Sequence, residues 1–163
     1  MATGAETFLK TIKNKWKYRL FLLKKLPAAF FAGVQVQQAS LQQCTVSVPF
    51  KWATQNPFRS TYFACLAMAA EMSTGVLAMA HLYGRKPAVS MLVVSMESHF
   101  HKKATGLTFF TCADGAAIQQ AVEQSVHTGK GQAVKVYTMG TNGQGEVVAE
   151  FWFTWSFKPK QKG

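Results

Sequence analysis

Glu71 is the residue whose surroundings most strongly suggest chemistry. It is one of seven acidic residues in a chain of 163, and it is the only carboxylate inside a long apolar stretch rich in Ala, Met and Leu. Burying an unpaired charge is costly, so its presence needs a reason. Desolvation raises the pKa of a carboxyl group, which suits a general base near neutral pH. The alternative is a structural carboxylate that accepts backbone N–H groups or meets a partner across a dimer interface.

Other residues offer weaker chemistry. His99 and His101 are spaced to lie on one side of a strand and could bind a metal, but no third ligand is evident nearby. Cys65 is a poor nucleophile candidate because it lies on an apolar helix without a histidine partner in sequence. The chain has no Gly-rich phosphate loop, Ser-His-Asp signature or zinc motif. We therefore predict neither a metal nor a cofactor.

The formal net charge of +11 arises as much from a scarcity of acids as from an abundance of bases. A basic surface attracts nucleic acid, membrane headgroups or a phosphorylated small molecule such as coenzyme A, and it also serves solubility alone. Four basic residues flank predicted strand ends and could meet phosphates or form a solvated rim: Arg85, Lys86, Lys102 and Lys103. No recognised nucleic-acid-binding module is present, so we do not expect a nucleic-acid partner.

Residues 6–26 have a helical pattern that ends at Pro27. Its apolar residues recur every three or four positions, with lysines between them: Phe8, Ile12, Trp16, Leu20 and Leu23. Such a helix could lie on an anionic membrane, or it could pack its apolar stripe on its own domain and expose its lysines. We predict a basic N-terminal extension over residues 1–26, with the role left open, and a single domain over residues 27–163.

From its cysteine content and N-terminal sequence we expect a cytoplasmic protein. Its three cysteines, Cys44, Cys65 and Cys112, include no CxxC pair and form no disulfide framework, which fits a reducing compartment. Lys24 and Lys25 interrupt the apolar run near the N-terminus, so the segment is a poor secretory signal.

The remaining pattern predicts an α+β fold with a curved antiparallel sheet around one long helix. The apolar stretch 60–83 predicts a helix buried on every side, and Ser60 and Thr61 are its candidate N-caps. A membrane span is the alternative, opposed by Glu71 and by the β-rich sequence that follows. Asn142-Gly143 predicts a hairpin between the last two strands. Strands are expected at 31–39, 43–50, 89–100, 106–112, 132–139 and 146–157, with a short helix at 116–126.

The segment from Asn56 to Glu71 resembles the hotdog-fold acyl-CoA thioesterases of the phenylacetate-pathway and 4-hydroxybenzoyl-CoA type. Their pattern is roughly N-x-x-G-[ST]-x-H-G-G-x-L-x-x-x-x-[DE], and Asn56, Ser60, Leu66 and Glu71 match it. The resemblance extends over residues 31–157 and is nearest to a branch of unknown function. It implies a homodimer, with a tetramer as the alternative, and hydrolysis of an acyl thioester at a site between subunits.

The resemblance also implies roles for individual residues. Glu71 would be the catalytic carboxylate, acting as a general base on water or as a nucleophile on the thioester carbonyl. Asn56 would position water or hold the loop before the helix. Backbone N–H groups near Phe63 and Ala64 would polarise the thioester carbonyl. The other substrate-binding positions would be Ser60, Tyr62, Thr74, Gly75 and Ser90.

The chain departs from the family pattern at the start of the helix. Arg59 stands where the family has glycine, Tyr62 where it has histidine, and Phe63 and Ala64 where it has two glycines. These bulkier residues motivate a second hypothesis, a non-catalytic protein that binds an acyl chain or acyl-CoA, with contact to a membrane surface as an added property.

Overall fold

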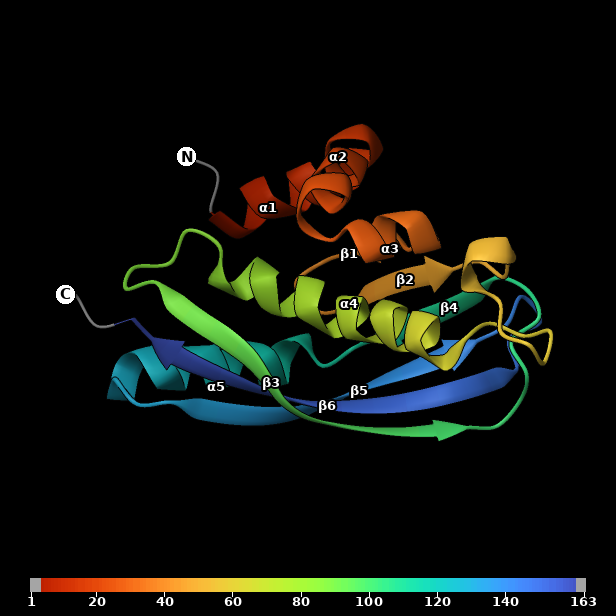
Figure 1. Cartoon of the computed structure of the whole chain (residues 1–163). Helices are drawn as coiled ribbons and strands as arrows, with labels where there is room; N and C mark the ends of the chain where they lie inside the picture. Colours follow the sequence, from red (N-terminus) through yellow and green to blue (C-terminus); the bar gives the residue numbers. More distant parts are fainter. Residues whose placement is uncertain (1–3, 161–163) are drawn as a thin grey trace.

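A six-stranded antiparallel sheet curves around one long helix, α4 (Figure 1). This is a computed structural model, and it describes residues 4–160. The predicted α+β fold with extra N-terminal helices is confirmed. The helices are α1 (Gly4–Lys13), α2 (Lys15–Lys25), α3 (Pro27–Ala32), α4 (Phe63–Leu82) and α5 (Gly115–Thr128), with a 3-10 turn, η1, at Trp52–Thr54. The strands are β1 (Gln35–Ala39), β2 (Cys44–Val48), β3 (Val89–Phe100), β4 (Thr108–Cys112), β5 (Gln132–Thr141) and β6 (Val147–Pro159).

The sheet has the order β1-β2-β4-β5-β6-β3, so β1 and β3 form its two edges. Among the described residues 4–160, β3 pairs only with β6, from Val89 opposite Pro159 to Phe100 opposite Ala149. Most of its twelve residues are exposed. A long edge strand of this kind presents a row of unpaired backbone groups along one side. β3 is therefore free to pair with another strand.

Helix α4 is the centre of the core. By length and apolar composition it could cross a membrane, and it is the one such helix among residues 4–160. Its residues are instead largely buried inside the fold, against β2, β4 and β5. Two buried hydrogen bonds fix it to the sheet: one joins the Ser73 and Thr138 hydroxyls at 2.8 Å, and in the other Trp155 donates to Thr74 at 3.0 Å. The burial of α4 agrees with the predicted core helix rather than with a membrane span.

The N-terminal region differs from the single helix predicted over residues 6–26. Asn14 divides it, because its side-chain oxygen accepts the Lys17 N–H and begins a second helix. The change of direction moves the buried face: Tyr18 and Leu22 pack inward on α2, whereas Trp16 is 85% exposed. The predicted apolar stripe holds for Phe8 and Ile12 and is wrong beyond Asn14.

Pro27 ends α2, as predicted, but it also occupies the first turn of another helix, α3. The strand predicted at 31–39 therefore begins late, at Gln35. Gly33 ends α3 at φ +78°, a conformation that favours glycine. The other predicted strands, the helix near 116–126 and the hairpin are confirmed with shifts of a few residues. In the hairpin the left-handed glycine is Gly145 rather than Gly143.

Aromatic rings fill the core between the sheet and α4. Phe151 lies within 6.0 Å, centroid to centroid, of Phe100, Phe110 and Phe153. Helix α5 packs against α4 and against β5 and β6, closing the core near the C-terminal end of α4 (Figure 1). The three cysteines are buried and free, and Cys44 faces Cys112 across β2 and β4.

Candidate functional site

Most of the predicted site residues fall into two groups along α4, and Ala64, Thr74 and Ser90 line neither cavity. One group surrounds a cleft at the start of the helix, and the other surrounds a smaller slot at Glu71. The two cavities share no lining residue. Phe63 and Glu71 are eight residues apart, which corresponds to ~12 Å along a helix. One thioester carbonyl cannot contact both groups of the same chain.

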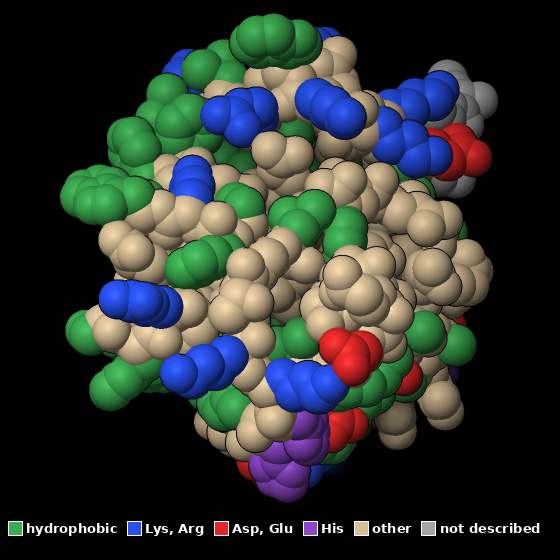
Figure 2. Space-filling view, turned by 90° about the vertical axis from the view of Figure 1, so that its right-hand side faces the viewer, with side chains coloured by type: hydrophobic (Ala, Val, Ile, Leu, Met, Phe, Trp, Pro, Cys, Tyr) green, Lys and Arg blue, Asp and Glu red, His purple; other side chains and the backbone are tan. Residues whose placement is uncertain are grey.

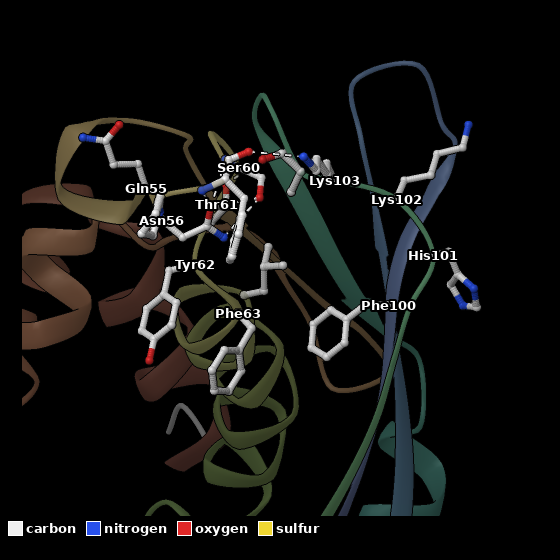
Figure 3. Close-up of a pocket in the computed structure, with 14 residues that line it drawn as sticks. Gln55, Asn56, Ser60, Thr61, Tyr62, Phe63, Phe100, His101, Lys102 and Lys103 are labelled. Carbon is white, nitrogen blue, oxygen red and sulfur yellow. Dashed lines mark hydrogen bonds between the residues drawn. The ribbon is translucent and has the colours of Figure 1, made fainter.

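The cleft at the start of α4 has a volume of about 630 Å³ (Figure 3). Phe63, on the first turn of α4, faces Phe100, at the end of β3, with ring centroids 6.4 Å apart. Lys103 donates to the Phe58 carbonyl at 3.3 Å. In Figure 3 the His101 and Lys102 side chains point outward, where they meet Glu150 and Glu146. The cleft thus has an aromatic interior, and Lys103 is the rim cation that no carboxylate pairs within residues 4–160.

A tight loop leads into α4, and Asn56 organises it. Its Oδ1 accepts the backbone N–H groups of Phe58 and Ser60, and its Nδ2 donates to the Ser60 hydroxyl. Arg59 has φ +59°. Such a conformation is unusual for a residue with a Cβ, so the structure explains why the resembling family has glycine at this position. Of the two roles considered for Asn56, its contacts favour holding the loop.

The first turn of α4 lacks the side-chain cap expected from Ser60 or Thr61. Helix α4 begins at Phe63, and Tyr62 occupies the capping position. The Tyr62 side chain makes no hydrogen bond to the helix. Ser60 bonds to Asn56 instead, and Thr61 donates to the Ala104 carbonyl at 3.1 Å. Within residues 4–160 no acceptor bonds to the backbone N–H groups of Phe63 and Ala64. These two donors remain available at the positive end of the helix dipole.

The slot at Glu71 is small and apolar, with a volume of about 100 Å³. Burial raises the pKa of the Glu71 carboxyl group, as the sequence predicted. In the described part of the chain this carboxylate has no hydrogen-bond or ion-pair partner. Its lining comes from three directions, α1–α2, α4 and β3: Phe8, Ile12, Tyr18, Phe21, Leu26, Met72, Gly75, Val76, Met79 and Met91.

Gly75 provides the space that the Glu71 carboxylate occupies. A Cβ at position 75 would lie 3.1 Å from Glu71 Oε1 and 3.5 Å from the Trp155 ring. Thr74, beside it, does not line the slot: its hydroxyl donates to the Glu71 carbonyl at 2.9 Å and accepts Trp155 Nε1–H. Gly75 therefore shapes the slot, while Thr74 holds the backbone that carries Glu71.

The remaining predicted residues lie outside the slot. Ser90 is exposed on β3 beside Met91, and its hydroxyl donates to the Lys158 carbonyl. Ala64 is half-buried and lines neither cavity. His99 contacts the Trp152 ring and His101 bonds to Glu150, so the two histidines have separate partners. No group of three metal-ligating side chains occurs within residues 4–160.

Sequence reasoning missed Tyr18 and Met91 as neighbours of Glu71. Tyr18 donates to Met72 Sδ at 3.0 Å, and its phenol pKa is raised by burial first and then by the nearby charges of Cys44 and Glu71. The spacing of Tyr18 and Leu22 was a usable signal, since it marks the inner face of α2. No local signal indicated Met91, because strand pairing across the sheet brings it to the slot.

Solved structures resemble this chain over nearly its whole length. A protein of unknown function from Pseudomonas aeruginosa, described as a probable thioesterase, superposes with a TM-score of 0.73 at 19% identity, covering 98% of this chain and 99% of its own. A thioesterase from Haemophilus influenzae gives 0.66 at 9% identity, covering 91% and 93%. A protein of unknown function from Chlorobaculum tepidum gives 0.74 at 13% identity, covering 94% and 99%.

These likenesses confirm the hotdog fold. Over residues 15–157 the sequence matches the family described as a domain of unknown function (DUF4442), and the chain belongs to that family. The matched residues include α2 and α3. No curated protein matches the sequence.

Proposed function

We propose that this protein hydrolyses an acyl thioester, with Glu71 as the general base, at sites shared between two subunits. The observation that carries the proposal is the unpaired Glu71 carboxylate, with its raised pKa, in an apolar slot on the central helix. Glu71 is half-buried, and ionising it there is unfavourable because burial raises its pKa, so a catalytic task accounts for the carboxylate better than a structural one.

The reaction needs a general base and hydrogen-bond donors for the negative charge that develops on the carbonyl oxygen. Glu71 takes a proton from water as the water oxygen attacks the thioester carbonyl carbon. The N–H groups of Phe63 and Ala64 stabilise the negative charge that develops on the carbonyl oxygen. The C–S bond then breaks, the thiolate leaves and takes up the proton that Glu71 holds, and the carboxylic acid remains, so that Glu71 is again ionised. An apolar lining of Met, Phe and Val suits an acyl tail, and Lys103 at the cleft rim suits the phosphates of coenzyme A.

A second copy of the chain supplies the missing half of each site. One side of the edge strand β3 is unpaired in the described chain. The side chains of Met96 and Phe100, both on β3, are 45% and 48% exposed although they lie opposite buried residues of β6. Pairing of β3 with its symmetry mate would cover them. An antiparallel arrangement of two α4 helices would bring the first turn of one toward Glu71 of the other. We propose a homodimer of this kind in the cytoplasm.

Thioester hydrolysis is tested with a panel of short-chain, medium-chain, long-chain and aromatic acyl-CoAs. Free thiol released by the wild-type protein is measured at a series of substrate concentrations. A Glu123→Gln variant is the matched control, since Glu123 is an exposed residue on α5. We expect saturable turnover of one class of substrate by both proteins. Absence of turnover across the panel would contradict the proposal.

Gly75→Ala separates activity from stability. A helical glycine costs ~1 kcal/mol relative to alanine, so the melting temperature should stay constant or rise. The added Cβ crowds Glu71 Oε1, and a displaced base should lower kcat/KM ~10-fold. Adding Gly75→Ala to Glu71→Gln should cause little further loss. Unchanged turnover in the single variant would show that the carboxylate position is not critical.

A specific observation favours a second candidate, an acyl-CoA-binding protein without catalysis. The Phe63 side chain, 53% exposed, stands at the cleft in contact with both Tyr62 and Phe100. These rings narrow the approach to the first turn of α4. Saturable binding of acyl-CoA without thiol release, unchanged by Glu71→Gln, would support this function over hydrolysis.

A further inference from the structure

Helix α2 has two apolar faces, and the fold uses only one of them. Tyr18 and Leu22 are 6% and 1% exposed; Tyr18 donates to Met72 on α4, and both line a cavity together with residues at the start of β1. Trp16, Leu20 and Leu23 recur at intervals of four and three residues and form a second stripe, which is 85%, 52% and 42% exposed. With 3.6 residues per turn, this outer stripe lies on roughly the opposite side of the helix from the buried pair. It faces solvent along the length of α2.

Positive charge surrounds the outer stripe. Lys17 and Lys24 flank it on one side and Arg19 on the other, and α2 has no acidic residue. Arg19 lies over the Phe30 ring at 4.8 Å, while no ion pair neutralises Lys17, Lys24 or Lys25 in the described part of the chain. In Figure 2 blue side chains lie over the upper part of the molecule, where the N-terminal helices lie in Figure 1, and also lower on the same face, whereas most red ones lie in the lower part.

We propose that the outer stripe of α2 binds the surface of an anionic lipid bilayer. A helix with Trp and Leu on one face and lysines beside them lies in the interface plane, with apolar side chains among the acyl chains and cations at the headgroups. Each cation near such a surface strengthens binding ~5-fold at low salt. The exposed apolar side chains and the unpaired lysines are both satisfied by this partner.

A second copy of the chain fits this face poorly. In a two-fold dimer the same patch meets itself, so lysines would oppose lysines. The acids of the chain cannot serve as a complementary patch, since four of the seven already form ion pairs elsewhere: Glu97, Glu123, Glu146 and Glu150. Charge complementarity therefore selects the lipid surface.

The position of α2 connects this surface to the substrate. This inference about the substrate rests on the proposed function, whereas lipid binding does not. Phe21 and Leu26, at 40% and 45% exposure, lie on α2 and directly after it, and both line the slot at Glu71. The helix that carries the outer stripe thus also forms part of the wall of that slot. Acyl thioesters that partition into membranes would then be the favoured substrates.

The test is co-sedimentation of the full chain with vesicles of phosphatidylglycerol and phosphatidylcholine, compared with phosphatidylcholine alone. Two variants remove the two components: Trp16→Ala/Leu20→Ala/Leu23→Ala and Lys17→Glu/Lys24→Glu. The matched control is Lys130→Glu/Lys158→Glu, which makes the same charge change at exposed lysines far from α2 in the sequence. Circular dichroism checks that all variants remain folded, as the exposure of the altered residues leads us to expect.

We expect wild type and control to bind the anionic vesicles, binding to fall at least ~10-fold in both α2 variants, and high salt to weaken it. Equal binding to both vesicle types, or an equal loss in the control, would overturn the proposal. The proposal would also be overturned if the wild type did not bind vesicles and the Trp16→Ala/Leu20→Ala/Leu23→Ala variant changed its oligomeric state. That result would show that a second copy of the chain covers the outer stripe. RNA binding in place of vesicle binding would overturn it as well.

Discussion

Replacing Glu71 by Gln is expected to lower kcat/KM for the best acyl-CoA by at least ~100-fold. A positioned general base contributes ~100-fold to ~10,000-fold, and glutamine keeps the shape of the side chain without accepting a proton. Because burial raises the pKa of Glu71, the wild-type rate should rise with pH through a value above that of an ordinary glutamate and then level off. Initial rates of thiol release across pH 4 to 9 measure both effects.

The same substitution should improve stability at neutral pH. The folded state binds the Glu71 proton more tightly than the unfolded chain does, so this group makes stability fall as pH rises from the ordinary glutamate pKa through the raised one. Glutamine removes that loss, and its melting temperature should equal or exceed that of wild type at pH 8. A variant that is inactive because it is unfolded would show the reverse, and full activity would exclude Glu71 as the base.

Phe63→Pro should have the second large effect, a loss of ~100-fold to ~1000-fold in kcat. Proline removes one backbone N–H at the first position of α4, and loss of one oxyanion donor has this magnitude. The substitution suits the local backbone, since proline is favoured at this position and Tyr62, at φ −59° and ψ 134°, already has the conformation required before proline.

Phe63→Ala is the matched control because it removes the same ring and keeps the N–H group. Its kcat should stay within ~10-fold of wild type, and the wider cleft should admit bulkier substrates. Equal losses in the two variants would assign the effect to the ring and remove the Phe63 N–H from the mechanism. Melting curves of both proteins show whether the helix start is intact.

The strands and the central helix could be predicted because their patterns are strong. Val, Phe and Trp alternate along β6, and the run from Phe63 to Leu82 is apolar on every face. The N-terminal helices could not be separated in the same way, because Trp16, Leu20 and Leu23 continue the spacing of Phe8 and Ile12 across the break at Asn14. The spacing of Tyr18 and Leu22 competes with that stripe, and the contact of Tyr18 with Met72 and the burial of Leu22 show which face of α2 is inside.

The candidate site could be predicted where one residue type was unusual in its surroundings. Glu71 stood out as a lone carboxylate in an apolar run, and the structure places it in an apolar slot. Ser60 and Thr61 were expected as caps from their residue types, yet Ser60 bonds to Asn56 within the loop and Thr61 donates to the Ala104 carbonyl. Which residues approach Glu71 from α2 and β3 depends on long-range packing, which no local pattern encodes.

The shared site is tested most directly by mixing two inactive subunits. Glu71→Gln and Phe63→Pro chains, carrying different tags, are co-expressed, and the doubly tagged dimer is purified and assayed for thiol release alongside each parent and wild type. If each site takes Glu71 from one subunit and the first turn of α4 from the other, the mixed dimer contains one intact site of two. It should therefore recover about half of the wild-type rate per dimer. A mixed dimer no more active than its parents would contradict the account, because it would place both groups of each site in one chain.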